Sequence, residues 1–308
     1  MKLIAPDYYG TFSCIADKCK HSCCVGWEID IDEETFADYQ SVGGEFGERL
    51  RRGIEIGEDG AHFCLSSDER CPFLNENGLC DIILTLGEDR LSQICTDHPR
   101  FCSFFCDRTE IGLGLCCEEA GRILLSKKEK TRLVVLQDDG EGDMPSAEEE
   151  AFFRRRDRLF AMAQDRNHPI SERMNMLLNE VQVGFPEKSF SDWVALFLSL
   201  ERMDDAWEAL LTKARDLPTQ KEEVDTGLET AWEQLLCYFL YRHVSDPEED
   251  IRKKVFFSVL SVRMIRALFR RLFRWEKNGP EALVELCRLY SSEIEYSEEN
   301  TQYLEELA

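Results

Sequence analysis

Residues 14–32 read CIADKCKHSCCVGWEIDID and carry four cysteines within the first eleven positions, the last two of them adjacent. Twelve of the 14 cysteines in the chain lie between Cys14 and Cys117. The chain has 308 residues, 43% of them hydrophobic, so it can bury a sizeable core and does not need disulfides for stability. In a reducing compartment, clustered cysteines are better explained as thiolate ligands of a metal. This cluster therefore predicts an N-terminal region that is organised around a metal.

The spacing of the cysteines favours an iron-sulfur cluster over a zinc finger. Zinc fingers and ribbons use CxxC knuckles, because a gap of two residues lets one turn aim both sulfurs at a single ion. No such pair occurs in this chain, and the later cysteines of the region are spread over positions 64, 71, 80, 95, 102, 106, 116 and 117. Ligands drawn from several loops suit a larger inorganic core, such as a [4Fe-4S] cluster held by four thiolates. Zinc is the alternative.

The charge and hydropathy of the chain argue against two broad classes of function. The formal net charge of −24 argues against nucleic-acid binding, because a surface that binds phosphates needs an excess of basic residues. No apolar run approaches the length that spans a bilayer, and the first ten residues lack the apolar run of a signal peptide. We therefore expect a cytoplasmic protein that binds neither nucleic acid nor membrane.

The chain is expected to be mainly α, with two regions joined by a linker at about residues 137–146. In residues 1–137 we expect short helices and short strands, at 108–115 and 131–137, with little regular structure beyond them. In residues 146–308 helix start signals recur, at Ser146, Pro247, Pro280 and Ser297. Six or seven helices, among them 170–183, 190–213 and 224–243, are expected to pack as an irregular helical bundle.

Three blocks of sequence resemble the flagellin lysine N-methylase family, which is related to the CxxCxxCC type of zinc- or iron-chelating domain. They are residues 14–32, residues 71–101 (CPFLNENGLCDIILTLGEDRLSQICTDHPRF) and residues 112–125 (GLGLCCEEAGRILL). The resemblance covers residues 1–135, and over the helical remainder it is one of general character. It implies transfer of a methyl group from S-adenosylmethionine to the side-chain nitrogen of a protein lysine, with flagellin as the protein substrate. No site for S-adenosylmethionine is recognisable in the sequence.

The same resemblance implies a set of metal ligands. Residue by residue, the family pattern matches Cys14, Cys19, Cys23, Cys24, Cys71, Cys80, Cys95 and Cys117. The remaining cysteines of the region, at positions 64, 102, 106 and 116, lie outside the pattern. Eight candidates exceed the four thiolates of one [4Fe-4S] cluster, and spacing does not choose among them.

Trp27, Glu28 and Asp30 are candidate catalytic residues, because an aromatic wall beside carboxylates could hold a lysine ammonium and then accept its proton. The alternative interpretation is structural: Trp27 anchors the core, and the acids, with Asp32, form the wet side of a short strand. The function also has an alternative. A non-catalytic iron-sulfur or zinc-binding protein, such as an electron carrier, sensor or adaptor, would need the cysteines but neither S-adenosylmethionine nor a lysine substrate.

Overall fold

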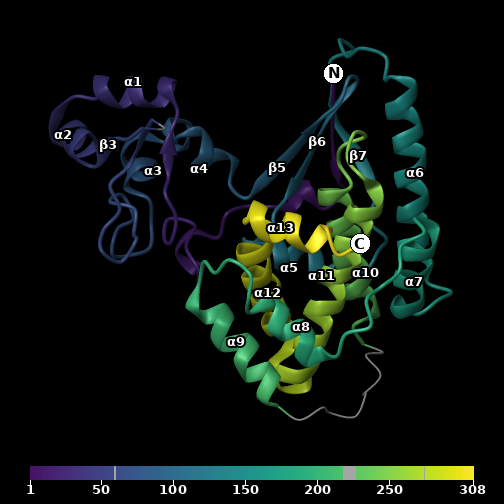
Figure 1. The fold of residues 1–308 in the computed structure, drawn as a ribbon. Helices are drawn as coiled ribbons and strands as arrows, with labels where there is room; N and C mark the ends of the chain where they lie inside the picture. The colour runs from purple at the N-terminus through teal and green to yellow at the C-terminus, as the bar shows by residue number, and fades with distance from the viewer. Residues whose placement is uncertain (59, 218–226, 274) are drawn as a thin grey trace. The chain divides into compact units, whose positions relative to one another are not determined.

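The computed structural model describes residues 1–58, 60–217, 227–273 and 275–308, and Figure 1 shows its helices and strands. Helices hold 54% of the residues and strands hold 12%, so the predicted mainly α class is confirmed. The chain forms two compact units. The first, called the helical unit, comprises residues 1–12 and 101–308, and the second, called the cysteine unit, comprises residues 13–100.

This division differs from the predicted boundaries of 1–137 and 146–308, because a sheet joins the start of the chain to later segments. Strand β1 (Lys2–Pro6) pairs in parallel with β6 (Arg108–Leu113) and antiparallel with β7 (Leu133–Asp138). With β5 (Arg100–Phe104) the strand order is β5-β6-β1-β7. The expected strands at 108–115 and 131–137 are thus confirmed. Residues 139–146 form an irregular connection, as expected of a linker, but both of its ends belong to the helical unit.

The rest of the helical unit consists of helices whose starts follow the predicted capping signals. Ser146 forms a capping box with Glu149 at the start of α6, and Ser297 caps the last helix. The expected helix at 190–213 is two helices, because Asp204 caps a new start. In chain order the helices are α5 (Glu118–Ser126), α6 (Ala147–Ala163), α7 (Ile170–Glu180), α8 (Phe190–Phe197), α9 (Asp205–Asp216), α10 (Glu229–His243), α11 (Ile251–Leu272), α12 (Trp275–Tyr290), a π-helix (Ser291–Glu295) and α13 (Glu298–Glu305). Part of the predicted helix 224–243, residues 224–226, lies outside the described residues.

Helix α10 forms the centre of the helical unit. Every residue from Ala231 to Tyr241 is buried, and Trp232 and Phe239 are fully inaccessible to solvent. A helix that is buried on all sides needs partners around its whole circumference. Helices α5, α6, α7 and α11 pack against it. Among the described residues, no helix is long and apolar enough to cross a membrane.

A buried ion pair joins α6 to the sheet of the helical unit. The guanidinium of Arg156 on α6 donates to the carboxylate of Glu110 on β6 at 2.6 Å, and both side chains are 2% exposed. Arg156 also donates to the carbonyl oxygen of Val244 and lies over the ring of Phe153. Two charges taken out of water are stable only with such partners, so the pair fixes the position of α6 against β6.

The cysteine unit has a small core and short elements. Its second sheet has the order β2-β4-β3, and Tyr39, Leu50 and Phe73 are among its fully buried side chains. The elements are a 3-10 turn (Ala16–Lys18), β2 (Asp30–Ile31), α1 (Glu33–Ser41), α2 (Gly44–Arg52), β3 (Ile54–Ile56), β4 (Ala61–Phe63), α3 (Asp81–Leu86), a 3-10 turn (Glu88–Arg90) and α4 (Gln93–Asp97). Residues 1–137 therefore contain more regular structure than predicted. The sequence did not reveal it, because the strands are short and several of them pair with distant segments.

The buried pair predicts an unequal response to two substitutions on one helix. Arg156→Ala leaves the Glu110 carboxylate buried without its partner, so we expect the free energy of unfolding to fall by about 3–5 kcal/mol. Arg154→Ala removes an exposed partner of Glu150 on the same helix and is expected to cost less than about 0.5 kcal/mol. Urea denaturation followed by circular dichroism measures both. Equal losses for the two variants would contradict a role for the buried pair.

Candidate metal-binding thiol site in the cysteine unit

Short backbone pairings bring the double cysteine of the first block to the second block. The N–H of Cys71 donates to the carbonyl oxygen of Cys24 at 2.8 Å, and Val25 forms an isolated bridge with Arg70. A second bridge, between Leu74 and Cys80, closes the turn that follows Cys71. These pairings bring the loops that carry the three cysteines together without a regular sheet.

The third block is held to the same place by side chains. Asp32, at the end of β2, accepts from the N–H of Gln93 at 2.9 Å, and this bond fixes the start of α4, the helix that carries Cys95. The hydroxyl of the buried Tyr39 donates to the carbonyl oxygen of Arg90 at 2.7 Å, just before α4. Cys95 then packs against the small core, as Cys24 and Cys80 do.

Five thiols lie within electrostatic range of one another and are called the thiol group below: Cys23, Cys24, Cys71, Cys80 and Cys95. Burial, together with negative charge on the neighbouring cysteines of the group, raises the pKa of Cys71 to about 12. Burial likewise raises the pKa of Cys95 to about 11 and raises that of Cys80. Buried thiols that repel one another once ionised are stabilised as thiolates by a bound cation.

The adjacent pair differs from the other three thiols. The hydrogen bond between the side chains of Cys23 and Cys24, the Ser22 hydroxyl and the positive charge of Arg70 together lower the pKa of Cys24 to about 7, against the effect of burial. The same hydrogen bond, with burial, raises the pKa of Cys23. Cys24 is therefore the member of the thiol group that ionises first near neutral pH.

The remaining predicted ligands are Cys14, Cys19 and Cys117. Cys14 is exposed and lies within electrostatic range of Cys23, and the thiol of Cys19 donates to the carbonyl oxygen of His21. Cys117 belongs to the helical unit, where it precedes α5. Cys64, which lies outside the family pattern, is partly exposed, with its sulfur 4.0 Å from the carbonyl oxygen of Arg52. Five of the eight predicted ligands are thus brought together.

The thiol group offers soft donors from several segments of the cysteine unit. Within residues 1–58, 60–217, 227–273 and 275–308, no three or more Cys, His, Asp or Glu side chains are arranged so that they could hold one metal ion. The thiol group nevertheless supplies more than the four soft donors that an iron-sulfur cluster requires, from three separate segments. Ligand softness also favours iron-sulfur or zinc over calcium or magnesium.

Trp27 lies beside the thiol group, whereas the candidate carboxylates lie in water. The indole N–H of Trp27 donates to the carbonyl oxygen of Cys23 at 2.7 Å, and its ring stacks on that of His98 at 6.2 Å. Burial lowers the pKa of His98 to about 4, with a contribution from Arg100. Glu28 and Asp30 are exposed, and Asp32 caps α1. This placement agrees with the structural interpretation of the segment, and the catalytic assignment stays a prediction.

Sequence reasoning missed a buried ionic network in the helical unit. The carboxylate of Glu295, fully buried in the π-helix, contacts the imidazole of His243 at 2.8 Å and the guanidinium of Arg242 at 3.3 Å. It also accepts from the Tyr238 hydroxyl, and the thiol of Cys116 contacts the hydroxyl of Tyr296 at 3.0 Å. Burial opposes ionisation, but Arg242 and His243 lower the pKa of Glu295 to about 2. No local pattern marks residues so far apart in the chain.

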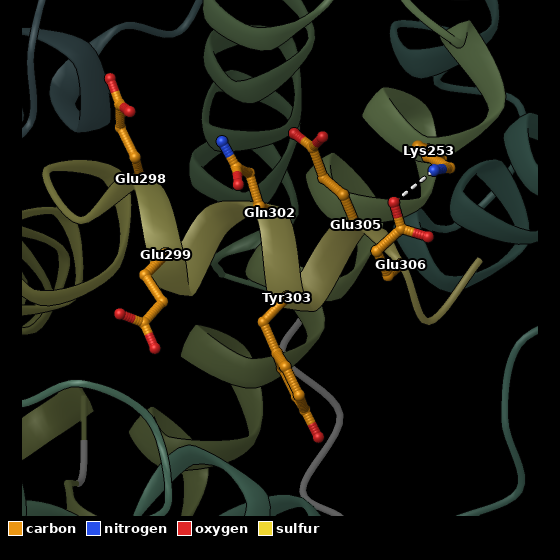
Figure 2. A pocket seen from close by; sticks show the side chains of 7 residues that line it. All are labelled: Lys253, Glu298, Glu299, Gln302, Tyr303, Glu305 and Glu306. Carbon is orange, nitrogen blue, oxygen red and sulfur yellow. Dashed lines mark hydrogen bonds and ion pairs between the residues drawn. The ribbon is translucent and has the colours of Figure 1, made fainter.

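Two hollows occur on the described surface, and neither includes a thiol. One, of about 610 Å³, lies along α13 and is lined mainly by glutamates; Figure 2 shows Lys253 reaching Glu306 across it, at 2.5 Å. The other, of about 720 Å³, lies in the cysteine unit beside Phe46 and Arg49. Arg49 is held by Asp81 and by the carbonyl oxygen of Pro72, so its charge is already satisfied.

Comparison with known proteins supports the predicted resemblance. Residues 180–308 match the family model of the FliB lysine N-methylase C-terminal domain. The chain is 29% identical over 126 residues to the lysine-N-methylase of Salmonella typhimurium, an alignment that covers 39% of this chain and 31% of that protein. The same identity relates it to the flagellar biosynthetic protein FliU of Salmonella muenchen, of which 75% is covered. No solved structure matches.

The resemblance to the flagellin lysine N-methylase family is therefore confirmed, and the aligned part spans about a third of the length of the lysine-N-methylase that it matches. The family model covers the helical part, where only a general likeness was expected.

Asp32 both caps α1 and accepts a hydrogen bond from Gln93, so its substitution is expected to destabilise α1, whereas substitution of Asp30 is not. Asp32→Ala removes the N-cap of α1 and the bond to Gln93, so we expect a loss of about 1–2 kcal/mol in the opening free energy of α1, measured by hydrogen exchange. The Gln93 and Thr35 N–H groups lower the pKa of Asp32, although partial burial acts in the opposite direction. The Asp32 carboxylate therefore contributes to stability above its unfolded pKa of about 3.9, and this stability is lost as pH falls through the folded pKa.

The matched control is Asp30→Ala, which changes an exposed residue of the same segment and is expected to leave exchange in α1 and α4 unchanged. If the two alanine variants exchanged alike, the proposed link between β2 and α4 would be wrong.

Proposed function

Because residues 180–308 resemble the C-terminal domain of the FliB lysine N-methylases, we propose that this chain is a protein-lysine N-methyltransferase, or the greater part of one. The observation that carries the proposal is this match, together with relatives that bear the name lysine-N-methylase. S-adenosylmethionine is proposed as the methyl donor on the resemblance alone. Flagellin is the proposed substrate, in line with the flagellar name of FliU.

The proposed metal group is a [4Fe-4S] cluster held by members of the thiol group. Cys24, Cys71, Cys80 and Cys95 pack against one core, and Cys23 is the alternative to Cys24. When bound, such a cluster would supply a redox-active iron centre. What supports iron-sulfur over zinc is the absence of CxxC knuckles in the sequence.

The residues of the chain would prepare this site in two ways. Arg70 and the Ser22 hydroxyl favour the thiolate form of Cys24 near neutral pH, which is the form that binds metals. Cys71 is buried and Cys80 and Cys95 are partly buried, which limits the contact of their sulfurs with water, and Trp27 fixes the backbone at Cys23 by a hydrogen bond to its carbonyl oxygen.

The acceptor lysine must be neutral when its nitrogen attacks a methyl group, so a group nearby must take its proton. Glu28 and Asp30 are exposed carboxylates beside Trp27, and they are the proposed proton acceptors. The ring of Trp27 could contact the ammonium before its proton leaves. The net charge of −24 favours encounters with a lysine-rich protein surface.

The activity is tested by incubating the anaerobically purified chain with S-adenosylmethionine and flagellin. Mass spectrometry is expected to show lysine masses raised by one or more methyl groups, and none when S-adenosylmethionine is omitted. Glu28→Gln with Asp30→Asn is expected to slow the transfer at least about tenfold, since general-base catalysis contributes at least that much. Unchanged flagellin, from a sample with its metal intact, would leave the non-catalytic iron-sulfur protein as the function.

The metal is tested by a pair of cysteine variants in the cysteine unit. Cys24→Ser removes a central member of the thiol group and is expected to lower the iron and acid-labile sulfide content to less than about half of the parent value. Cys64→Ser changes a cysteine outside the thiol group and is expected to retain the parent content. Elemental analysis of both proteins, purified without oxygen, makes the comparison. Stoichiometric zinc without iron would contradict the cluster and support a zinc site.

A further inference from the structure

Strand β7 forms one edge of the four-stranded sheet and is exposed along almost its whole length. Within the described part of the chain it is hydrogen-bonded to β1 on one side and to no strand on the other. Val134, Val135 and Leu136 are 36%, 55% and 42% exposed. In natural edge strands, charged residues or proline usually prevent pairing with another chain. Residues 133–137 contain no charged residue and no proline.

A bulge interrupts the pairing of the exposed apolar residues of β7 with β1. Leu3 pairs with Gln137 and Ile4 pairs with Val135, so Leu136 is the extra residue on β7. Val134 and Val135 pair with consecutive residues of β1 and so point to opposite faces, whereas the bulge re-aims the side chain of Leu136. The exposed apolar edge formed by residues 134–136 is called the ridge.

The ends of this ridge carry opposite charges. Before the strand lie the exposed Lys128, Lys130 and Arg132, with the exposed Glu129 between them. Asp138 ends the strand, and Asp139, Glu141 and Asp143 follow it; all four are exposed, and Asp139 pairs with the N-terminal ammonium. Both flanks are fixed in place. The carbonyl oxygen of Thr131 accepts from Gln164, that of Glu129 accepts from Gln234, and Asp143 donates its N–H to the carbonyl oxygen of Cys106. These hydrogen bonds hold the backbone of both flanks, so the charged residues keep their places at the two ends of the ridge.

We infer that β7 is the contact surface for a second copy of this chain, arranged antiparallel about a two-fold axis through the ridge. An antiparallel copy brings each basic end against an acidic end, so the surface is complementary to itself, as a two-fold interface requires. The two ridges then cover each other, and the opposite charges meet at both ends. A parallel arrangement would instead set like charges against each other.

The size of the contact sets its strength. A pairing built on one strand from each copy is smaller than a standard protein interface, and each copy carries a net charge of −24. The dimer is therefore weak and reversible, with a dissociation constant in the micromolar range or above. This association is independent of the proposed methyl transfer, because it involves neither the thiol group nor residues 180–308.

Sedimentation velocity from about 1 to about 100 μM, a range that spans such affinities, tests the dimer directly. Two charge-reversed proteins sharpen the test: Lys130→Glu with Arg132→Glu makes both ends of β7 acidic, and Asp138→Lys with Glu141→Lys and Asp143→Lys makes both ends basic. Each protein alone is expected to dimerise at least about tenfold more weakly than the parent, because like charges then meet. An equimolar mixture of the two is expected to form the dimer again.

Two further variants distinguish the ridge from general charge. Lys213→Glu with Arg215→Glu changes the net charge by the same amount as the acidic variant, on the exposed side of α9, and is expected to dimerise like the parent. Val135→Lys places a charge on the ridge at a half-exposed position and is expected to abolish the dimer. A parent protein that stays monomeric at every concentration would overturn the inference. So would a dimer that none of the β7 variants weakens.

Discussion

The cysteine unit depends on the hydrogen bond between the N–H of Cys71 and the carbonyl oxygen of Cys24. This bond, with the bridge between Val25 and Arg70, joins two loops that share no regular sheet. The unit has 88 residues, from Ser13 to Arg100, and few of its side chains are fully buried. A core of that size gives little stability, so ligation of a metal by the thiols that these loops carry would add folding free energy where the chain has least of its own.

The helical unit is built on the opposite principle. Its central helix α10 is buried on all sides, and the charges inside the unit are paired with each other. Glu110 binds Arg156, Glu233 binds Arg173, and Glu295 binds Arg242 and His243. Such pairs contribute little net stability, but removing one partner is costly, so they fix the packing of the helices.

Sequence patterns predicted the features that are local and missed those that join distant residues. Capping signals correctly predicted the starts of α6 and α13. The helix start at Asp204 was missed, because the apolar spacing of the predicted helix 190–213 continues across this residue. The predicted regions differ from the two compact units because β1 pairs with strands more than a hundred residues away. A change in composition along the chain does not reveal such pairing. The cysteines were visible at once, but only the fold assigns Cys117 to the helical unit and the thiol group to the cysteine unit.

The acidic character of this protein lies on its surface. The chain has 37 lysines and arginines against 61 acids, and buried arginines such as Arg156, Arg173 and Arg242 are each paired with a buried carboxylate. Because such buried pairs are close to neutral, they leave the net charge of −24 on the exposed part of the chain. A basic partner is favoured by such a surface, and the cations before β7 then become the exception that gives the β7 edge its two opposite ends.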